Sequence, residues 1–181
     1  MTLRVLTDTD RQSKLATNHE KLIAQLGSVN KQFSGTSGNA LQDINVEVFQ
    51  KDFLSIVGPS GCGKTSILKM MCGLIKPTSG TINWPTSNFQ NSPENPANLS
   101  FVFQEPNLLP WMNVYENIKM PLRILKEDSY SADEKIYEII KLVGLEGFEG
   151  YYPKQLSGGM SMRVSIARAL VTQPKVLLMD E

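Results

Sequence analysis

A glycine-rich segment in the first half of the chain has the composition and spacing of a phosphate-binding loop. It runs from Gly58 to Thr65, reads GPSGCGKT, and matches the pattern G-x-x-x-x-G-K-[ST]. Its glycines let successive backbone N–H groups point at phosphate oxygens, while a following helix directs its positive end at the same anion. Lys64 would supply charge for the β- and γ-phosphates, and the Thr65 hydroxyl would bind Mg²⁺. The nucleotide-binding residues predicted here are Gly58, Pro59, Ser60, Gly61, Cys62, Gly63, Lys64, Thr65 and Ser66.

Two later segments carry groups that could act on a bound nucleotide. Leu156–Met160 reads LSGGM, so a serine hydroxyl, two glycines and a helix start could form a second anion site. An ordinary serine-capped helix is the alternative interpretation of this segment taken alone. The apolar run at 176–179 leads into Asp180 and Glu181. Asp180 could hold Mg²⁺, and Glu181 could orient and deprotonate an attacking water.

The elements that must position these groups alternate between strands and helices. We predict strands at 28–33, 44–49, 53–57, 81–84, 99–103 and 176–179. We predict helices over 65–75, from a capping box at Ser131 and Glu134 to a stop at Gly144, and from a cap at Ser157 to about Val171. The phosphate loop thus lies between a strand and a helix, the context that distinguishes it from a plain glycine-rich turn. This alternation predicts an α/β fold with a parallel sheet.

Composition narrows the class of protein. The 181 residues include 18 basic and 18 acidic side chains, with no run of like charges, so no nucleic-acid partner is predicted. Cys62 and Cys72 have no metal-ligand spacing and are typical of reduced thiols. No apolar run approaches the roughly 18 residues that span a bilayer, and the N-terminus has no secretory signal. We therefore expect a cytoplasmic chain that reaches the membrane through a partner.

Taken in order, the motifs resemble those of ABC transporter ATPases. The order is phosphate loop, Gln104, the LSGGM signature with residues 163–170, and the acidic pair. The resemblance covers about Gly27 to Glu181 and implies a P-loop NTPase of the ABC ATPase type. That type has a parallel core sheet, an N-terminal antiparallel β part, and a helical subdomain that carries the signature. The expected domains are a polar N-terminal extension over 1–25 and an ABC ATPase domain over 26–181, incomplete at its C-terminus, with the helical subdomain at about 105–172.

The resemblance also implies residue roles. ATP would lie between two ATPase subunits that face head to tail. Phe33 would stack on adenine, although a core aromatic is the alternative, and Gln104 would sense Mg²⁺ and the γ-phosphate, or else be a solvated loop residue. The implied Mg²⁺ ligands are Thr65, Gln104 and Asp180, and Glu181 is the implied catalytic base. The residues that would reach the ATP of the partner subunit are Ser157, Gly158 and Gly159.

A loop after Gln104 is expected to meet a membrane partner. Leu108, Leu109 and Trp111 would form an exposed apolar patch, and in the family this neighbourhood receives an integral membrane permease. The segment 103–111, FQEPNLLPW, with Met160 where most signatures carry glutamine, is similar to ATPases of nitrate, sulfonate and taurine importers. Such importers also use an extracytoplasmic binding protein.

Three other functions stay open from the sequence: a soluble ABC ATPase of repair or translation, a P-loop kinase, and a catalytically inert fragment. The inert fragment stays open because three features of the family would follow Glu181. These are the dimer-contacting loop, a further core strand and a switch histidine. We therefore expect residues 1–181 by themselves to bind ATP poorly, to hydrolyse none and to be marginally folded.

Overall fold

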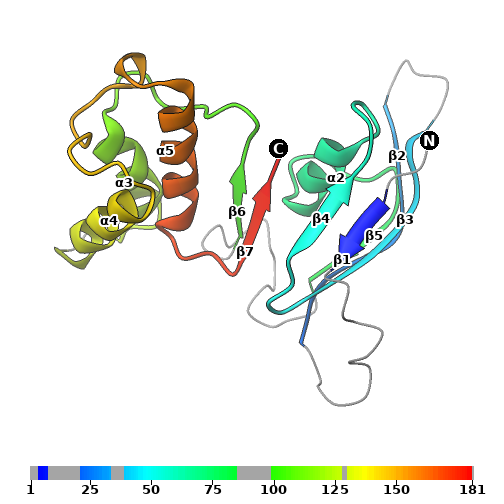
Figure 1. The fold of residues 1–181 in the computed structure, drawn as a ribbon. Coiled ribbons are helices and arrows are strands. Elements are labelled where there is room, and N and C mark those ends of the chain that lie inside the picture. The colour runs from blue at the N-terminus through cyan, green and yellow to red at the C-terminus, as the bar shows by residue number, and fades with distance from the viewer. Residues whose placement is uncertain (1–3, 8–20, 34–38, 85–98, 128–129, 181) are drawn as a thin grey trace. The chain divides into compact units, whose positions relative to one another are not determined.

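The computed structural model describes residues 4–7, 21–33, 39–84, 99–127 and 130–180 (Figure 1). The chain divides into two compact units, 1–95 and 96–181, which are described separately. None of the helices in the described ranges has both the length and the apolarity needed to cross a membrane.

The first unit contains a three-stranded antiparallel sheet in the order β3-β2-β5. Its strands are β2 (Leu22–Gln32), β3 (Asn39–Phe49) and β5 (Ser79–Asn83). Ala24 and Leu26 of β2 are buried two residues apart, as one face of a strand requires. The buried position then shifts to Val29, because the ladder is irregular between Leu26 and Val29 and Ser28 has a φ of 48°. This bulge keeps the apolar side chains on the core face.

The same unit positions the phosphate loop. β1 (Arg4–Thr7) pairs antiparallel with β4 (Leu54–Val57), and the loop connects β4 to α2 (Lys64–Met71). The predicted extension over 1–25 therefore includes β1 and the start of β2 at Leu22, which is earlier than the strand start predicted at residue 28.

Helix α2 ends earlier than the predicted residue 75. Gly73 has a φ of 75°, and its N–H donates to Met70 O while the N–H of Leu74 donates to Lys69 O. This is the Schellman arrangement, which closes a helix with a glycine in the left-handed conformation. Leu74 is consequently exposed rather than part of the helix's buried face.

The described residues of the second unit form a parallel strand pair and a group of packed helices (Figure 1). β6 (Leu99–Val102) and β7 (Val176–Met179) pair in parallel from Leu99 opposite Val176 to Val102 opposite Met179. The helices are α3 (Val114–Ile124), α4 (Tyr130–Leu142) and α5 (Gly158–Leu170), with a short 3₁₀ helix at Pro153–Gln155. The expected fold class is confirmed, with an antiparallel β part, parallel strands, and a helical part that carries the signature.

Two helix starts differ from prediction. α3 was not predicted, although Asn113 and Glu116 form a complete capping box at its start. α4 begins at Tyr130, so Ser131 lies in its first turn and is not the N-cap. The predicted stop is confirmed, because Gly144 has a φ of 65° and Leu145 N–H donates to Ile140 O.

The three helices share one apolar core. Their buried side chains recur three or four residues apart, the spacing of one helix face. The members of this core are Val114, Ile118, Leu122, Ala132, Ile136, Ile140, Leu145, Val164, Ala167 and Val171.

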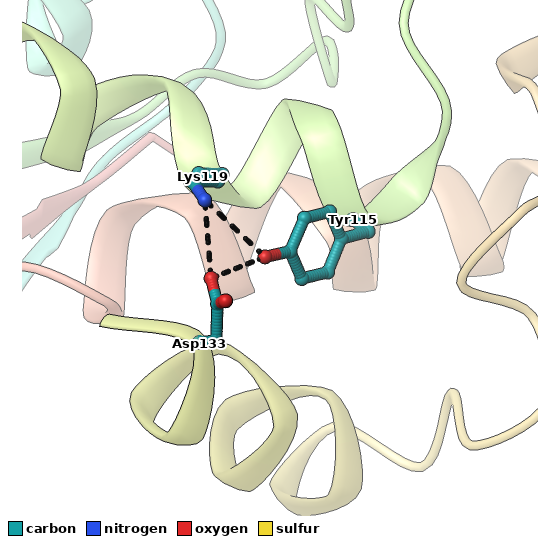
Figure 2. A network of polar contacts seen from close by, with 3 residues as sticks. All are labelled: Tyr115, Lys119 and Asp133. Atoms are coloured by element: carbon teal, nitrogen blue, oxygen red, sulfur yellow. Dashed lines mark hydrogen bonds and ion pairs between the residues drawn. The ribbon is translucent and has the colours of Figure 1, made fainter. Parts of the chain in front are cut away.

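A polar contact ties α3 to α4 at the edge of this core (Figure 2). The Asp133 carboxylate accepts a hydrogen bond from the Tyr115 hydroxyl, and Lys119 Nζ lies 3.1 Å from the same oxygen. The Tyr115 hydrogen bond, followed by that of Lys119, lowers the pKa of Asp133 from its ordinary value. Burial, followed by the hydrogen bond to Asp133, raises the pKa of Tyr115. The contact is therefore strongest at pH values between the pKa of Asp133 and the pKa of Tyr115, where the carboxyl is ionised and the hydroxyl is protonated.

We expect Leu122→Ala to reduce the free energy of unfolding by about 2–5 kcal/mol, because it removes a fully buried side chain and leaves a cavity. Ile124→Ala is the matched control on the same helix. Ile124 is 67% exposed, so its loss should cost roughly 0.5 kcal/mol or less. Urea unfolding of the intact protein measures both, and equal losses would contradict the assigned core.

Tyr115→Phe should raise the pKa of Asp133 toward its ordinary value, since the variant lacks the largest contribution that lowers it. A carboxyl whose pKa is lowered by folding stabilises the fold above its unfolded pKa, and this contribution is lost as pH falls through the folded value. The variant should therefore lose less stability than the parent as pH falls below about 3.8. NMR titration of the Asp133 carboxyl tests this, with Tyr137→Phe as control. An unchanged pKa in Tyr115→Phe would refute the assignment.

Candidate functional site

The phosphate loop is shaped by two glycines in the left-handed region. Gly61 has a φ of 77°, and Gly63, the N-cap of α2, has a φ of 100°. Between them, Cys62 is buried, and its N–H donates to Pro59 O at 3.2 Å. The chain therefore turns tightly out of β4 and delivers the first turn of α2, where backbone N–H groups have no intrahelical acceptor.

Gly63 is also constrained by a close neighbour in β3. A Cβ on Gly63 would lie 2.5 Å from Leu41 Cδ2 and 2.9 Å from Leu41 Cγ. A Cβ on Gly61 would meet nothing within 4 Å. Glycine is thus required at 61 by conformation alone, and at 63 by conformation and by space.

Lys64 folds back over the loop that precedes it. Its Nζ donates to Gly58 O at 2.9 Å and to Pro59 O at 3.2 Å. The positive charge is therefore held at the loop, beside the start of α2, where Thr65 and Ser66 occupy the first turn. A loop of backbone amides with a lysine and a hydroxyl fits the phosphates of a nucleotide and a Mg²⁺ ion bound to them.

Cys72 follows α2 and lies outside the phosphate loop. Its Sγ lies 3.4 Å from Lys69 O, and burial raises the pKa of the thiol. The thiol form is therefore favoured at neutral pH.

The signature lies at the start of α5 in the second unit. Ser157 is the N-cap, and its Oγ accepts a hydrogen bond from Met160 N–H at 3.2 Å. Gly158 and Gly159 are exposed, and a Cβ on either would meet nothing within 4 Å. The predicted cap is confirmed, and the two glycines leave the N-terminal end of the helix uncovered. Binding of a partner's nucleotide there stays a prediction.

The parallel pair brings two predicted site segments to one edge. Asp180 N–H donates to Val102 O at 3.0 Å, which extends the pairing of β7 with β6. Asp180, with a side chain only 7% exposed, therefore lies beside the end of the strand that leads to Gln104. Gln104 itself is exposed. Glu181 lies outside the described residues.

The loop after Gln104 only partly matches the expected apolar patch. Trp111 is 69% exposed, but Leu108 packs against the helical core and Leu109 is half-buried. Leu108 is thus a structural residue of this unit, because its side chain completes the core beneath the loop. A contact surface here would centre on Trp111.

Phe33 has an exposed ring, so it does not fill the core as the alternative interpretation had it. It is 40% exposed, and Lys31 Nζ lies 5.2 Å from the centre of the ring. A cation over one face is a favourable contact for an aromatic ring. The adenine-stacking role stays a prediction.

Comparison with known proteins gives these motifs a family. The sequence pattern described as "ABC transporter" matches residues 41–181. This chain belongs to the ABC transporter family.

Curated ABC relatives are similar over most of the chain. The spermidine/putrescine import ATP-binding protein PotA of Fusobacterium nucleatum is 46% identical over 162 residues, which cover 90% of this chain and 43% of the relative. An uncharacterized ABC transporter ATP-binding protein, MJ0412 of Methanocaldococcus jannaschii, is 42% identical over 150 residues, covering 83% and 55%. This ABC chain therefore spans about half the length of these relatives.

Solved ABC cassettes share the fold. The cassette MJ0796, in a dimeric post-hydrolysis state bound to ADP and Pi, matches with a TM-score of 0.74 and 32% identity, covering 88% of this chain and 74% of that one. CbiO1 of Clostridium perfringens, part of the transporter complex CbiONQ, matches with a TM-score of 0.70 and 24% identity, covering 90% and 66%. The second likeness supports the fold alone.

We expect Gly63→Ala to destabilise this ABC cassette more than Gly61→Ala. Each variant places a side chain in the left-handed region, at a cost of roughly 1–2 kcal/mol, but only the first also overlaps Leu41. Adding Leu41→Ala should recover part of the loss in Gly63→Ala and none in Gly61→Ala. A double-mutant cycle from urea unfolding measures this coupling. Equal behaviour of the two glycine variants would disprove the steric role of Leu41.

Proposed function

We propose that this ABC cassette binds and hydrolyses ATP to energise a membrane importer. The observation that carries the proposal is the Gly61–Gly63 turn with Lys64 held over it at the start of α2. The membership of the ABC family supports it, as does the likeness to MJ0796, a cassette solved with ADP and Pi.

In this proposal each site residue has a chemical task. The loop amides and Lys64 bind the β- and γ-phosphates, and Phe33 stacks on adenine. Bound Mg²⁺ would neutralise charge on the phosphate oxygens. Thr65, Gln104 and Asp180 supply oxygen ligands of the kind it takes, from a hydroxyl, an amide and a carboxylate. Glu181 orients a water and accepts its proton.

The proposed partners follow from what the cassette exposes. A second subunit, placed head to tail, would receive Ser157, Gly158 and Gly159 on its ATP, since this helix start is uncovered. MJ0796 is dimeric in its solved state. An integral membrane permease would contact the surface around Trp111, which places the protein at the inner face of the cell membrane. An extracytoplasmic binding protein would deliver the cargo to that permease.

Two cargo classes have separate support. The segment 103–111 and Met160 favour small anions such as nitrate, sulfonates and taurine. The 46% identity with a protein named for spermidine and putrescine import favours polyamines. Nitrate and simple sulfonates are anions and taurine is a zwitterion, whereas polyamines are cations, so uptake of labelled taurine and labelled spermidine by cells with and without the protein distinguishes the two classes.

We expect Glu181→Gln to retain ATP binding and to slow hydrolysis by about a hundredfold to ten-thousandfold, the usual contribution of a general base. Lys64→Ala should instead weaken ATP binding by roughly tenfold or more, since it removes a hydrogen bond from a charged donor. Lys69→Ala, on the same helix but outside the loop, is the control. Nucleotide titration and phosphate release in the intact protein separate the two effects.

The proposal fails if Lys64→Ala and Lys69→Ala bind ATP equally. If Glu181→Gln turns over ATP at the parent rate, the base must be another group.

A further inference from the structure

Arg168, in the last turn of the signature helix α5, holds the loop that follows Gln104. Its Nη2 donates to Pro106 O at 2.8 Å, and its Nη1 donates to Asn107 O at 2.9 Å. Asn107 has a φ of 47°, a conformation that asparagine tolerates better than most residues. The hydrogen bond to Pro106 is partly buried, and burial lowers the pKa of the Arg168 guanidinium. Two planar N–H donors thus fix two successive carbonyls.

A second anchor lies a few residues further along the loop. Asn117 of α3 is fully buried, and its Oδ1 accepts from Leu109 N–H at 2.9 Å. Its Nδ2 lies 3.2 Å from Leu109 O and 2.9 Å from Met112 O. The same Nδ2 lies 3.0 Å from Asn113 O, and Leu109 O also accepts from Met112 N–H at 3.1 Å. One buried amide therefore pairs with the N–H of Leu109 and contacts carbonyls on both sides of Trp111. Leaving the Leu109 N–H unpaired would cost about 1–3 kcal/mol.

Packing acts on the loop together with the two anchors, since Leu108 lies against the helical core. A cavity of about 570 Å³ lies beside the loop and is lined in part by Phe103, Leu109, Pro121 and Arg168. The hydrogen bonds of the two anchors hold the loop backbone beside this open space.

The Arg168 anchor attaches the loop to the end of α5 that lies opposite the signature. Ser157 caps one end of α5, and Arg168 lies in the last turn at the other, about 16 Å away at 1.5 Å per residue. α5 is rigidly seated, because Val164 and Ala167 are buried in the helical core. A displacement of the signature end is thus transmitted through the helix to the loop that bears Trp111.

We propose that Arg168, with Asn117, is a positioning residue that joins the signature helix to the Trp111 loop, so that the two move as one body. The transmission step rests on the proposed function, since it needs ATP at the signature and a permease at the loop. The attachment of the loop by Arg168 and Asn117, called the clamp below, does not rest on the proposed function. Its effect on the mobility of Trp111 is measurable without ATP and without a permease.

The test uses Trp111 as a fluorescent reporter in the intact protein, in a background where it is the only tryptophan, including Trp84→Phe in this chain. Arg168→Met should lower the anisotropy of Trp111 and raise its quenching by acrylamide, because the loop detaches about tenfold more often when hydrogen bonds from a charged donor are lost. ATP hydrolysed per cargo molecule transported should rise by a similar factor, with little change in the KM for ATP.

Arg163→Met is the matched control. Arg163 lies on the same helix, and its Nη1 also donates to two successive carbonyls, Val143 O at 3.0 Å and Gly144 O at 2.9 Å, but these end α4. It should leave the anisotropy of Trp111 at the parent value. If Arg168→Met does not fold, Arg168→Lys and Asn107→Val replace it. Arg168→Lys lacks the planar guanidinium, and Asn107→Val disfavours the left-handed conformation of residue 107.

Unchanged Trp111 anisotropy in these variants, or an equal change in Arg163→Met, would overturn the clamp. Altered anisotropy without any change in the ratio of hydrolysis to transport would overturn the transmission step. A parent protein that hydrolyses no ATP would count against the proposed function and leave the anisotropy result standing.

Discussion

Backbone amides can bind a phosphate only if no side chain covers them, and the two helix starts proposed as anion sites both meet that constraint. α2 begins after Gly63 and α5 begins with Gly158 and Gly159. At Gly63 a side chain would overlap Leu41, whereas at Gly158 there is open space. The first site is therefore shaped by its own unit. The second is exposed, as the proposed contact with a partner's nucleotide requires.

The two sites make different demands on the rest of the fold. The phosphate loop needs a strand to deliver it and a neighbour that limits its shape, and these are β4 and the Leu41 side chain of β3. The signature needs a helix whose orientation is fixed. The apolar face of α5 provides this by packing on α3 and α4, and Arg163 and Arg168 add contacts from that helix to two different chain segments.

Short sequence patterns predicted the elements that are marked by an apolar run or by a capping residue. The strand at 176–179 and the cap at Ser157 were found as predicted, because an apolar run and a serine before glycines are local signals. β1 was missed because its pairing with β4 is a long-range contact that four residues do not encode. α3 was missed because Pro121 interrupts its helical pattern, although Asn113 and Glu116 mark its start. Leu108 was expected at the surface because a loop sequence does not reveal what lies beneath it.

The state of the two thiols has a practical chemical consequence. Thiolates, not thiols, react with alkylating reagents, and burial raises the pKa of Cys72 while Cys62 is enclosed within the phosphate loop. Cys62 precedes α2 and Cys72 follows it. Both thiols should therefore react slowly until the region around α2 opens. The rate of alkylation under native conditions would thus report the local opening of the phosphate loop and α2, without any introduced label.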